Sequence, residues 1–235
     1  NLKAYDLEIG IDSEMMISSE EDGKIVLPAH IFSEILKKME DDSIKISSDE
    51  RNRVQIKGTN TEFTMLGLEA DEFPDLPIME ENHSVSLKDS HLKKLIDKTL
   101  FSASTSSQTP ILNGAIFEQK KNILTVAAVD GYRVAIMDEE LEEEGQDFKF
   151  IVPSKALYEI SKIIDEESDE ISKIYFGEKH ASFKMGNYQV ITRLLEGDFI
   201  DYRNAVPDEI NTEFTVRTQT FLQAIERVSI MIDIK

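Results

Sequence analysis

The sequence contains no cysteine and far less base than acid, and both facts narrow its function. Without cysteine, the chain forms neither a disulfide scaffold nor a cysteine-ligated zinc or iron–sulfur site. No stretch approaches the roughly 18 apolar residues of a membrane-spanning helix, so we expect no such helix. The 26 Lys and Arg against 46 Asp and Glu give a net charge of −20. A protein that docks on DNA with its whole surface should be basic, so this charge disfavours simple electrostatic docking.

The signatures of common enzyme classes are also missing. The sequence has no HExxH motif, no P-loop, no GxSxG and no GxGxxG. Four histidines are present: His30, His83, His91 and His180. None forms a close ligand pair, and we expect them to be polar surface residues. Asp130 stands three residues before Arg133, and the simplest interpretation is a turn with a structural ion pair. No group of residues argues for catalysis, for a cofactor or for a metal site.

What the 235 residues do contain is repetition. Apolar residues recur with helical spacing in four segments that start near residues 29, 91, 154 and 220, which are 62, 63 and 66 residues apart. Short alternating segments typical of strands lie between them, separated by turn signals. With 40% hydrophobic residues, the chain can also bury a core. Each unit of about 60 residues therefore predicts one helix with three or four antiparallel strands, which is an α+β fold.

The predicted helices each carry an apolar stripe that we expect to face a core. Pro28 opens the first helix, and Asp89 or Ser90 is expected to cap the second. The stripes of the second, third and fourth helices are Leu92, Leu95, Ile96, Thr99 and Leu100; Leu157, Ile160, Ile163 and Ile164; and Phe221, Leu222, Ile225, Val228 and Ser229.

A longer repeat overlies the short one. Residues 25–28 (IVLP) match residues 150–153 (FIVP) at an offset of 125, and residues 4–6 (AYD) match 128–130 (AVD) at 124. One complete long unit then runs from about residue 84 to 207. Because the chain starts and stops inside repeats, we expect it to be part of a longer protein.

The charges are unevenly placed. Acid concentrates at residues 18–22, 138–144 and 165–170, which we expect to be solvated turns, and none has the ligand pattern of a calcium loop. Base gathers on the exposed faces of the predicted helices: Lys37, Lys38, Lys93, Lys94, Lys98, Lys155, Lys162 and Arg227. Two interpretations stay open. These residues are either ordinary solubilising groups or a surface that makes loose, sequence-independent contacts with DNA phosphates.

Four longer stretches now form a recognisable pattern: residues 72–77 (EFPDLP), 128–135 (AVDGYRVA), 150–153 (FIVP) and 199–203 (FIDYR). In their order and spacing, over nearly the whole chain, they resemble the bacterial DNA polymerase III beta subunit, the sliding clamp. The resemblance implies the DNA clamp fold, with helices on one side and sheets outside. It assigns residues 1–80 to the second half of a first clamp domain, 84–207 to a complete second domain and 212–235 to the start of a third.

The resemblance also implies a function. Two full-length chains would form a head-to-tail homodimer ring that encircles double-stranded DNA in the cytoplasm, without membrane contact. The ring would be loaded by a clamp loader complex and would tether the alpha subunit of the replicative polymerase, acting as a non-catalytic processivity factor. An acidic peptide-binding scaffold that never encloses DNA remains the alternative. A nucleotidyl-transfer or exonuclease enzyme would need clustered metal-binding carboxylates, which the sequence does not suggest.

Two sites follow from the same resemblance. Clamp-binding-motif proteins would insert a short peptide into a pocket formed by Thr109, Leu112, Val129, Gly131, Tyr132, Arg133, Val134, Ile200, Asn204 and Ala205. Many family members carry Thr, His, Pro and Arg where this chain has Val129, Tyr132, Ile200 and Asn204, so its peptide preference is expected to differ. The ring interface would use Phe63 and Met65 on an edge strand against the neighbourhood of Ile230 and Met231. The alternative is ordinary core packing for Leu112, Val129, Val134, Phe63 and Met65.

Overall fold

The computed structural model describes residues 1–79, 81–106, 108–205 and 211–232. It divides into two compact units, Asn1–Ile200 and Asp201–Lys235. The predicted domain limits at residues 80 and 207 and the last three residues lie outside the described part. The helices are α1 (Ala29–Lys38), α2 (Asp89–Thr99), α3 (Ser154–Ile163) and α4 (Thr218–Ser229), with short 3-10 turns η1 (Ala70–Glu72), η2 (Leu100–Ser102), η3 (Pro110–Leu112) and η4 (Tyr202–Ala205).

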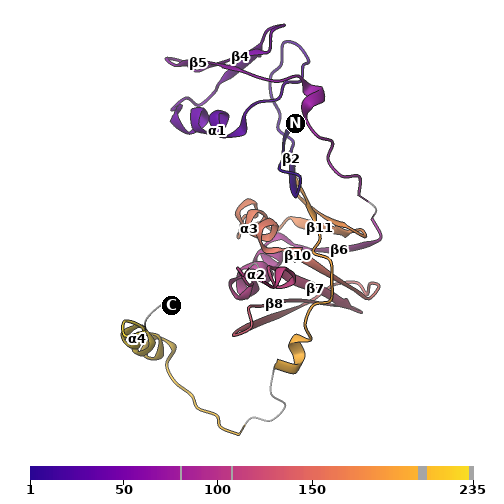
Figure 1. The fold of residues 1–235 in the computed structure, drawn as a ribbon, viewed down its shortest axis with the longest axis vertical. Helices are drawn as coiled ribbons and strands as arrows, with labels where there is room; N and C mark the ends of the chain where they lie inside the picture. Colours follow the sequence, from indigo (N-terminus) through magenta and orange to yellow (C-terminus); the bar gives the residue numbers. More distant parts are fainter. Residues whose placement is uncertain (80, 107, 206–210, 233–235) are drawn as a thin grey trace. The chain divides into compact units, whose positions relative to one another are not determined.

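Thirteen strands are described, all of them in the first unit (Figure 1). They are β1 (Leu2–Tyr5), β2 (Ile9–Ser13), β3 (Lys45–Ser48), β4 (Arg53–Lys57), β5 (Glu62–Leu66), β6 (His83–Lys88), β7 (Gly114–Lys120), β8 (Ile123–Val129), β9 (Val134–Glu140), β10 (Phe148–Pro153), β11 (Ile171–Phe176), β12 (His180–Met185) and β13 (Tyr188–Arg193). They form three antiparallel sheets with the orders β1-β2-β13-β12-β11-β6, β10-β7-β8-β9 and β3-β4-β5. The α+β class predicted from the sequence is confirmed.

The largest sheet joins the two sequence repeats. β2 comes from the first repeat and pairs with β13 of the second, with Ile11 opposite Val190. A strand from residues 9–13 thus completes a sheet whose other members lie at residues 83–88 and 171–193. Because these hydrogen bonds cross the repeat boundary, the first 200 residues fold as one unit.

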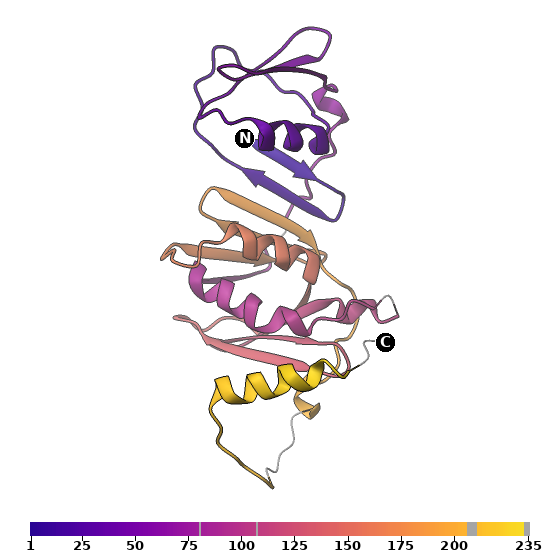
Figure 2. The same ribbon diagram turned by 90° about the vertical axis from the view of Figure 1, so that its left-hand side faces the viewer.

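The main core lies between the helices and the sheets of residues 83–194. From α2, Leu92, Leu95 and Ile96 are completely buried, and from α3 so are Leu157 and Ile160. The apolar stripes predicted for these two helices are therefore confirmed. Within the first unit, α1, α2 and α3 all lie in front of the strands in the view of Figure 2.

The first and last helices are covered far less. No residue of α1 is fully buried, and Ile31 is half exposed. The apolar residues of α4 are all exposed by 46 to 64%: Phe221, Leu222, Ile225 and Val228. The helical stripes are present in both cases, but the described part of the chain leaves that of α4 without a core.

The longer repeat has a structural counterpart. The β1–β2 hairpin and the β8–β9 hairpin lie 124 residues apart, and each turns through an aspartate followed by a residue with positive φ, Leu7 at 75° and Gly131 at 91°. In each turn the carboxylate accepts hydrogen bonds from the two backbone N–H groups that lie two and three residues further on. This agreement supports the repeat that the sequence predicted.

Several local expectations were wrong. Neither Asp89 nor Ser90 caps α2, because Asp89 is already the first helical residue and its buried carboxylate accepts hydrogen bonds from Ser168 and Ser172 instead. Residues 138–140 belong to strand β9, so only the second part of the acidic run at residues 138–144 is a loop.

Within the described residues, no helix has both the length and the apolar character needed to cross a membrane.

Candidate functional site

The basic residues on the helix faces fall into two groups. Lys37, Lys93, Lys155 and Lys162 all have partners. Lys37 pairs with Glu34 at 3.0 Å and Lys162 with Glu159 at 2.8 Å, each within its own helix. Lys38, Lys94, Lys98 and Arg227 are exposed and make no ion pair within the described residues. Because an unpaired lysine keeps its charge available, this second group is the better candidate for contact with phosphates.

Lys93 joins two helices. Its Nζ donates to the Ser161 backbone oxygen of α3 at 2.6 Å, and Ser161 Oγ in turn donates to Asp97 Oδ1 of α2 at 2.6 Å. The Lys93 side chain is only 18% exposed. It therefore satisfies a carbonyl in the last turn of α3, a position that a cation stabilises.

Lys155 crosses the repeat boundary. Its Nζ lies 2.7 Å from Asp6 Oδ2 in the β1–β2 turn and 3.6 Å from Glu8 Oε2. The hydrogen bond from Lys155, together with backbone N–H donors, lowers the pKa of Asp6 to about 2, and the same contact raises the pKa of Lys155. Both groups are thus ionised at neutral pH, and the pair holds the first turn of α3 to the hairpin of the preceding repeat.

Most positions predicted for the peptide pocket meet at one end of the four-stranded sheet. Val129 ends β8 and pairs with Val134, the first residue of β9. Gly131, Tyr132 and Arg133 form the turn between them. Thr109 lies just before η3 and Leu112 ends it. This turn leads directly into β7, the strand beside β8.

These positions differ in how much surface they offer. Leu112 and Val129 expose 7% and 2% of their surface, whereas Tyr132 exposes 98%. Ile200, at the end of the first unit, is 45% exposed. Asn204 and Ala205 lie in η4 of the second unit, where Asn204 Nδ2 donates to Asp201 at 3.0 Å.

The Asp130 turn is a structural ion pair, as the sequence predicted. Asp130 Oδ2 accepts hydrogen bonds from Arg133 Nε and Nη2 at 2.9 and 2.7 Å. Hydrogen bonds from the Tyr132 backbone and from Arg133 hold the pKa of this carboxylate below its usual range. The Arg133 guanidinium also lies over the Phe101 ring, 5.9 Å from its centroid. The pair fixes the turn and leaves the Tyr132 ring in solvent.

Phe63 and Met65 lie on β5, an outer strand of the three-stranded sheet. They stand opposite Ile56 and Val54, which are completely buried, so they share the inner face of the sheet. Phe63 is still 36% exposed and Met65 is half-buried. In the second unit, Ile230 and Met231 follow α4 and are 81% and 86% exposed.

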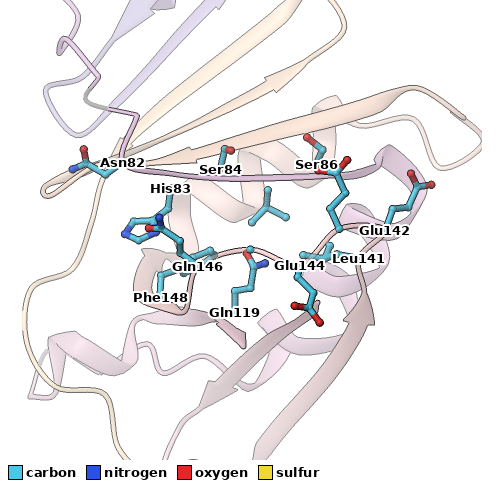
Figure 3. Close-up of a pocket in the computed structure, with 13 residues that line it drawn as sticks. Asn82, His83, Ser84, Ser86, Gln119, Leu141, Glu142, Glu144, Gln146 and Phe148 are labelled. Atoms are coloured by element: carbon cyan, nitrogen blue, oxygen red, sulfur yellow. The ribbon is translucent and has the colours of Figure 1, made fainter. Parts of the chain in front are cut away.

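The structure also contains a hollow that the sequence did not suggest. It has a volume of about 450 Å³ and is lined by β6 with the residue before it, the end of β7, and the β9–β10 loop with Phe148 (Figure 3). His83, expected to be a surface residue, is instead part of its wall, with its ring 5.5 Å from Phe148 and 5.6 Å from Phe150. Among the described residues, no group of three or more His, Asp or Glu side chains could hold a metal ion.

The fold thus defines a modular protein in which α+β repeats join edge to edge. Comparisons with known proteins show to which family it belongs. Models of the N-terminal and central domains of the DNA polymerase III beta subunit match residues 1–77 and 86–201. The beta sliding clamp of Bacillus subtilis is 36% identical over 217 residues, covering 92% of this chain and 57% of that protein. That of Staphylococcus aureus is 32% identical over 221 residues, covering 94% and 58%.

Solved structures agree with these relatives. The crystal structure of a DNA polymerase sliding clamp from Bacillus subtilis matches with a TM-score of 0.89 and 34% identity, over 99% of this chain and 63% of that chain. A sliding clamp from Bartonella birtlesii bound to griselimycin matches with a TM-score of 0.91 and 30% identity, over 99% and 63%. The chain belongs to the DNA polymerase III beta subunit family and has the DNA clamp fold. It spans about 57% of the length of the curated relatives that it matches.

Proposed function

We propose that this chain is part of a sliding clamp that encircles double-stranded DNA in the cytoplasm and confers processivity on a replicative polymerase without catalysing a reaction. The observation that carries the proposal is the arrangement of the first unit. Its repeats join through a continuous sheet, and its three helices lie on one side, where Lys38, Lys94 and Lys98 are exposed and unpaired within the described residues. The chain has a net charge of −20, so an acidic exterior would repel DNA and leave the helix-lined side as the favourable place for it.

Charge reversal on the helices tests the DNA-facing side. We expect K38E/K94E/K98E in the full-length protein to shorten its residence on nicked circular DNA several-fold, because three phosphate contacts become repulsive. A control with the same change in charge is K24E/K173E/K179E, at exposed lysines outside the helices. Equal losses in both triples would place the DNA elsewhere and favour the scaffold that never encloses DNA.

We assign residues 1–80, 84–207 and 212–235 to the first, second and third clamp domains. Within the first of these, β5 is the counterpart of β13, since Met65 lies 125 residues before Val190. Val190 is completely buried and pairs with Ile11 across the repeat boundary. The equivalent edge at Phe63 and Met65 pairs with no further strand in the described residues, which supports its proposed role in pairing with a second chain.

Subunit mass tests the ring interface. In the proposed interface, Ile230 and Met231 of one chain oppose β5 of another, and two chains form the ring. The full-length protein should then have twice the mass of one chain by light scattering. Met65→Glu should convert it to a monomer because a carboxylate would be desolvated in the seam. Ile171→Glu, at a half-exposed position on β11, is the control. A dimer that survives Met65→Glu would remove this edge from the interface.

The pocket positions suggest how partners bind. We propose that the polymerase alpha subunit, the clamp loader and other proteins with clamp-binding motifs dock at Leu112, Val134 and the exposed Tyr132 and Ile200. The solved sliding clamp from Bartonella birtlesii is bound to griselimycin. Tyr132→Ala and Val134→Glu should weaken binding of a clamp-binding peptide at least tenfold in a titration, because both remove apolar contact area. Unchanged affinity in folded variants would place the peptide elsewhere and favour core packing for Val134.

A further inference from the structure

The hollow in Figure 3 follows the open edge of a strand. β6 is the last strand of its sheet and, in the described part of the chain, pairs only with β11. Consecutive residues 82–86 all line the hollow. Because successive strand residues face opposite sides, a lining by five in a row means that the hollow runs along the edge rather than over one face. An open edge presents unpaired N–H and C=O groups that can accept a further strand.

The wall opposite this edge is acidic. Glu142, Glu143 and Glu144 belong to the loop between β9 and β10, and all three are exposed. No Lys or Arg is among the described residues that line the hollow. The acid therefore has no basic counterpart there, which favours a cationic ligand and disfavours a nucleic acid.

The floor holds an unpartnered polar group. Gln119 is 2% exposed; its Nε2 donates to the Lys121 oxygen at 2.8 Å, whereas its Oε1 has no partner within the described residues. Figure 3 shows this side chain among the residues that line the hollow, next to the acidic loop. A buried acceptor without a donor carries a desolvation cost, which a ligand N–H would relieve.

Gly145 decides how the loop lies over this group. A Cβ at Gly145 would clash with Gln119 Nε2, so only a glycine allows the loop to pack so closely on the amide. Gln119 Oε1 is itself buried. A ligand that reaches this oxygen must therefore lift the loop or turn the Gln119 side chain.

The groups around the hollow together favour one ligand chemistry. Carboxylates, an amide oxygen and edge carbonyls are acceptors, and they call for a ligand with several donors. A guanidinium carries five N–H donors and keeps its charge at any ordinary pH. A metal ion is disfavoured because the described residues contain no suitable group of three ligands.

We propose that this groove binds an extended basic segment of a protein partner, which adds a strand to β6 and places an arginine side chain between the acidic loop and Gln119. The groove is formed by residues other than those of the proposed peptide pocket. It would therefore be a second docking surface, and its existence does not depend on the ring.

A titration with a defined peptide tests the groove. The probe is a fluorescent peptide of alternating Val and Arg residues, and its control carries citrulline, the uncharged isostere, in place of arginine. Both are titrated into the 235-residue chain at physiological salt. Two triples remove the same charge: the groove triple E142Q/E143Q/E144Q and the distant triple E21Q/E50Q/E69Q, which lies at exposed loop positions of the first repeat.

The proposal expects the groove triple to weaken arginine-peptide binding about fivefold or more and the distant triple to change it less than about twofold. Gln119→Leu, which removes the acceptor but keeps the volume, should also weaken binding, in a variant whose circular dichroism is unchanged. Equal losses in both triples, or equal binding of the citrulline peptide, would show general attraction to a −20 surface and overturn the proposal. Hydrogen exchange supplies the second test: bound peptide should protect amides of residues 83–88, and unchanged exchange there would rule out strand addition.

Discussion

The contact between Asp6 and Lys155 offers a sharp test of how the repeats are held together. Asp6 Oδ1 accepts hydrogen bonds from the Glu8 and Ile9 N–H groups at 3.0 and 2.7 Å, and Oδ2 accepts one from Lys155. Asp6→Ala removes all three interactions. Asp6→Asn keeps the oxygen that faces the backbone but removes the charge, so the two variants separate the turn from the ion pair.

The expected magnitudes follow from exposure. The side chains of Asp6 and Lys155 are 49% and 60% exposed, so their ion pair should contribute only about 0.2–1 kcal/mol. Each backbone hydrogen bond adds about 0.5–1.5 kcal/mol. At pH 7 we therefore expect Asp6→Asn to lower the free energy of unfolding by less than about 1 kcal/mol and Asp6→Ala by about 1–4 kcal/mol.

The effect depends on pH in a defined direction. Because the pKa of Asp6 is lowered to about 2, its charge contributes fully above the unfolded pKa of about 4 and is lost as pH falls through about 2. The pKa of Lys155 is raised, so its contribution is present below the unfolded pKa of about 10.4 and is lost above the folded value. The pair should thus act between about pH 4 and about pH 10.

Urea unfolding of the wild-type chain and the two variants at pH 7 and pH 3 measures these differences, and carbon-13 NMR of the Asp6 carboxyl group reports its pKa directly. The difference in unfolding free energy between the wild-type chain and the Asp6→Asn variant should narrow at pH 3. If Asp6 titrates near its ordinary pKa of about 4, or if Asp6→Asn and Asp6→Ala are equally stable, the argument from this contact is refuted.

Other predictions concern the core and the two related turns. Ile96→Ala should lower the free energy of unfolding by about 2–5 kcal/mol in urea titrations, because Ile96 is completely buried; a loss below about 1 kcal/mol would contradict the packing described for α2. Leu7→Gly should raise the thermal midpoint, since a non-glycine residue at φ 75° costs about 1 kcal/mol. Gly131→Ala should lower the thermal midpoint, because it adds a similar free-energy cost to the folded state. A shift in the opposite direction for either variant would show that the two turns are not equivalent.

Local sequence predicted the helices well where a core exists to receive them. The stripe at Leu92, Leu95 and Ile96 is regular, and the structure buries it completely. The same regularity in α4 meets no core within the described residues. Periodicity therefore identifies an amphipathic helix, but not whether the apolar face is covered.

The misassigned details depend on residues far away in the sequence. Asp89 is an ordinary N-cap by type, yet Ser168 and Ser172, about 80 positions later, bind its carboxylate inside the fold. Lys93 was expected to face solvent, but the carbonyl that it reaches lies 68 residues away on α3. Neither partner can be identified from local patterns, because nothing in a single sequence indicates which distant loop or helix will pack there.

The clamp family could be predicted from motifs, whereas the groove beside β6 could not. It forms where residues 82–86 meet residues 141–148, and its acidic wall looked like an ordinary solvated loop. A signal was nevertheless present: His83 stands in an alternating segment with Ser84, Val85 and Ser86, which is typical of an edge strand with polar groups on one face.

The pairing of β2 with β13 has an evolutionary consequence. Ile11 and Val190 belong to different sequence repeats but are paired in the same sheet. A substitution on one side of this pairing therefore has to be matched by the residue on the other side. Swapping a whole repeat between related genes would leave mismatched borders, unless the cut were made inside a repeat instead of between two. Recombination that preserves such a molecule should therefore cut the gene at positions that keep paired strands together, even where these positions do not coincide with the ends of the sequence repeats.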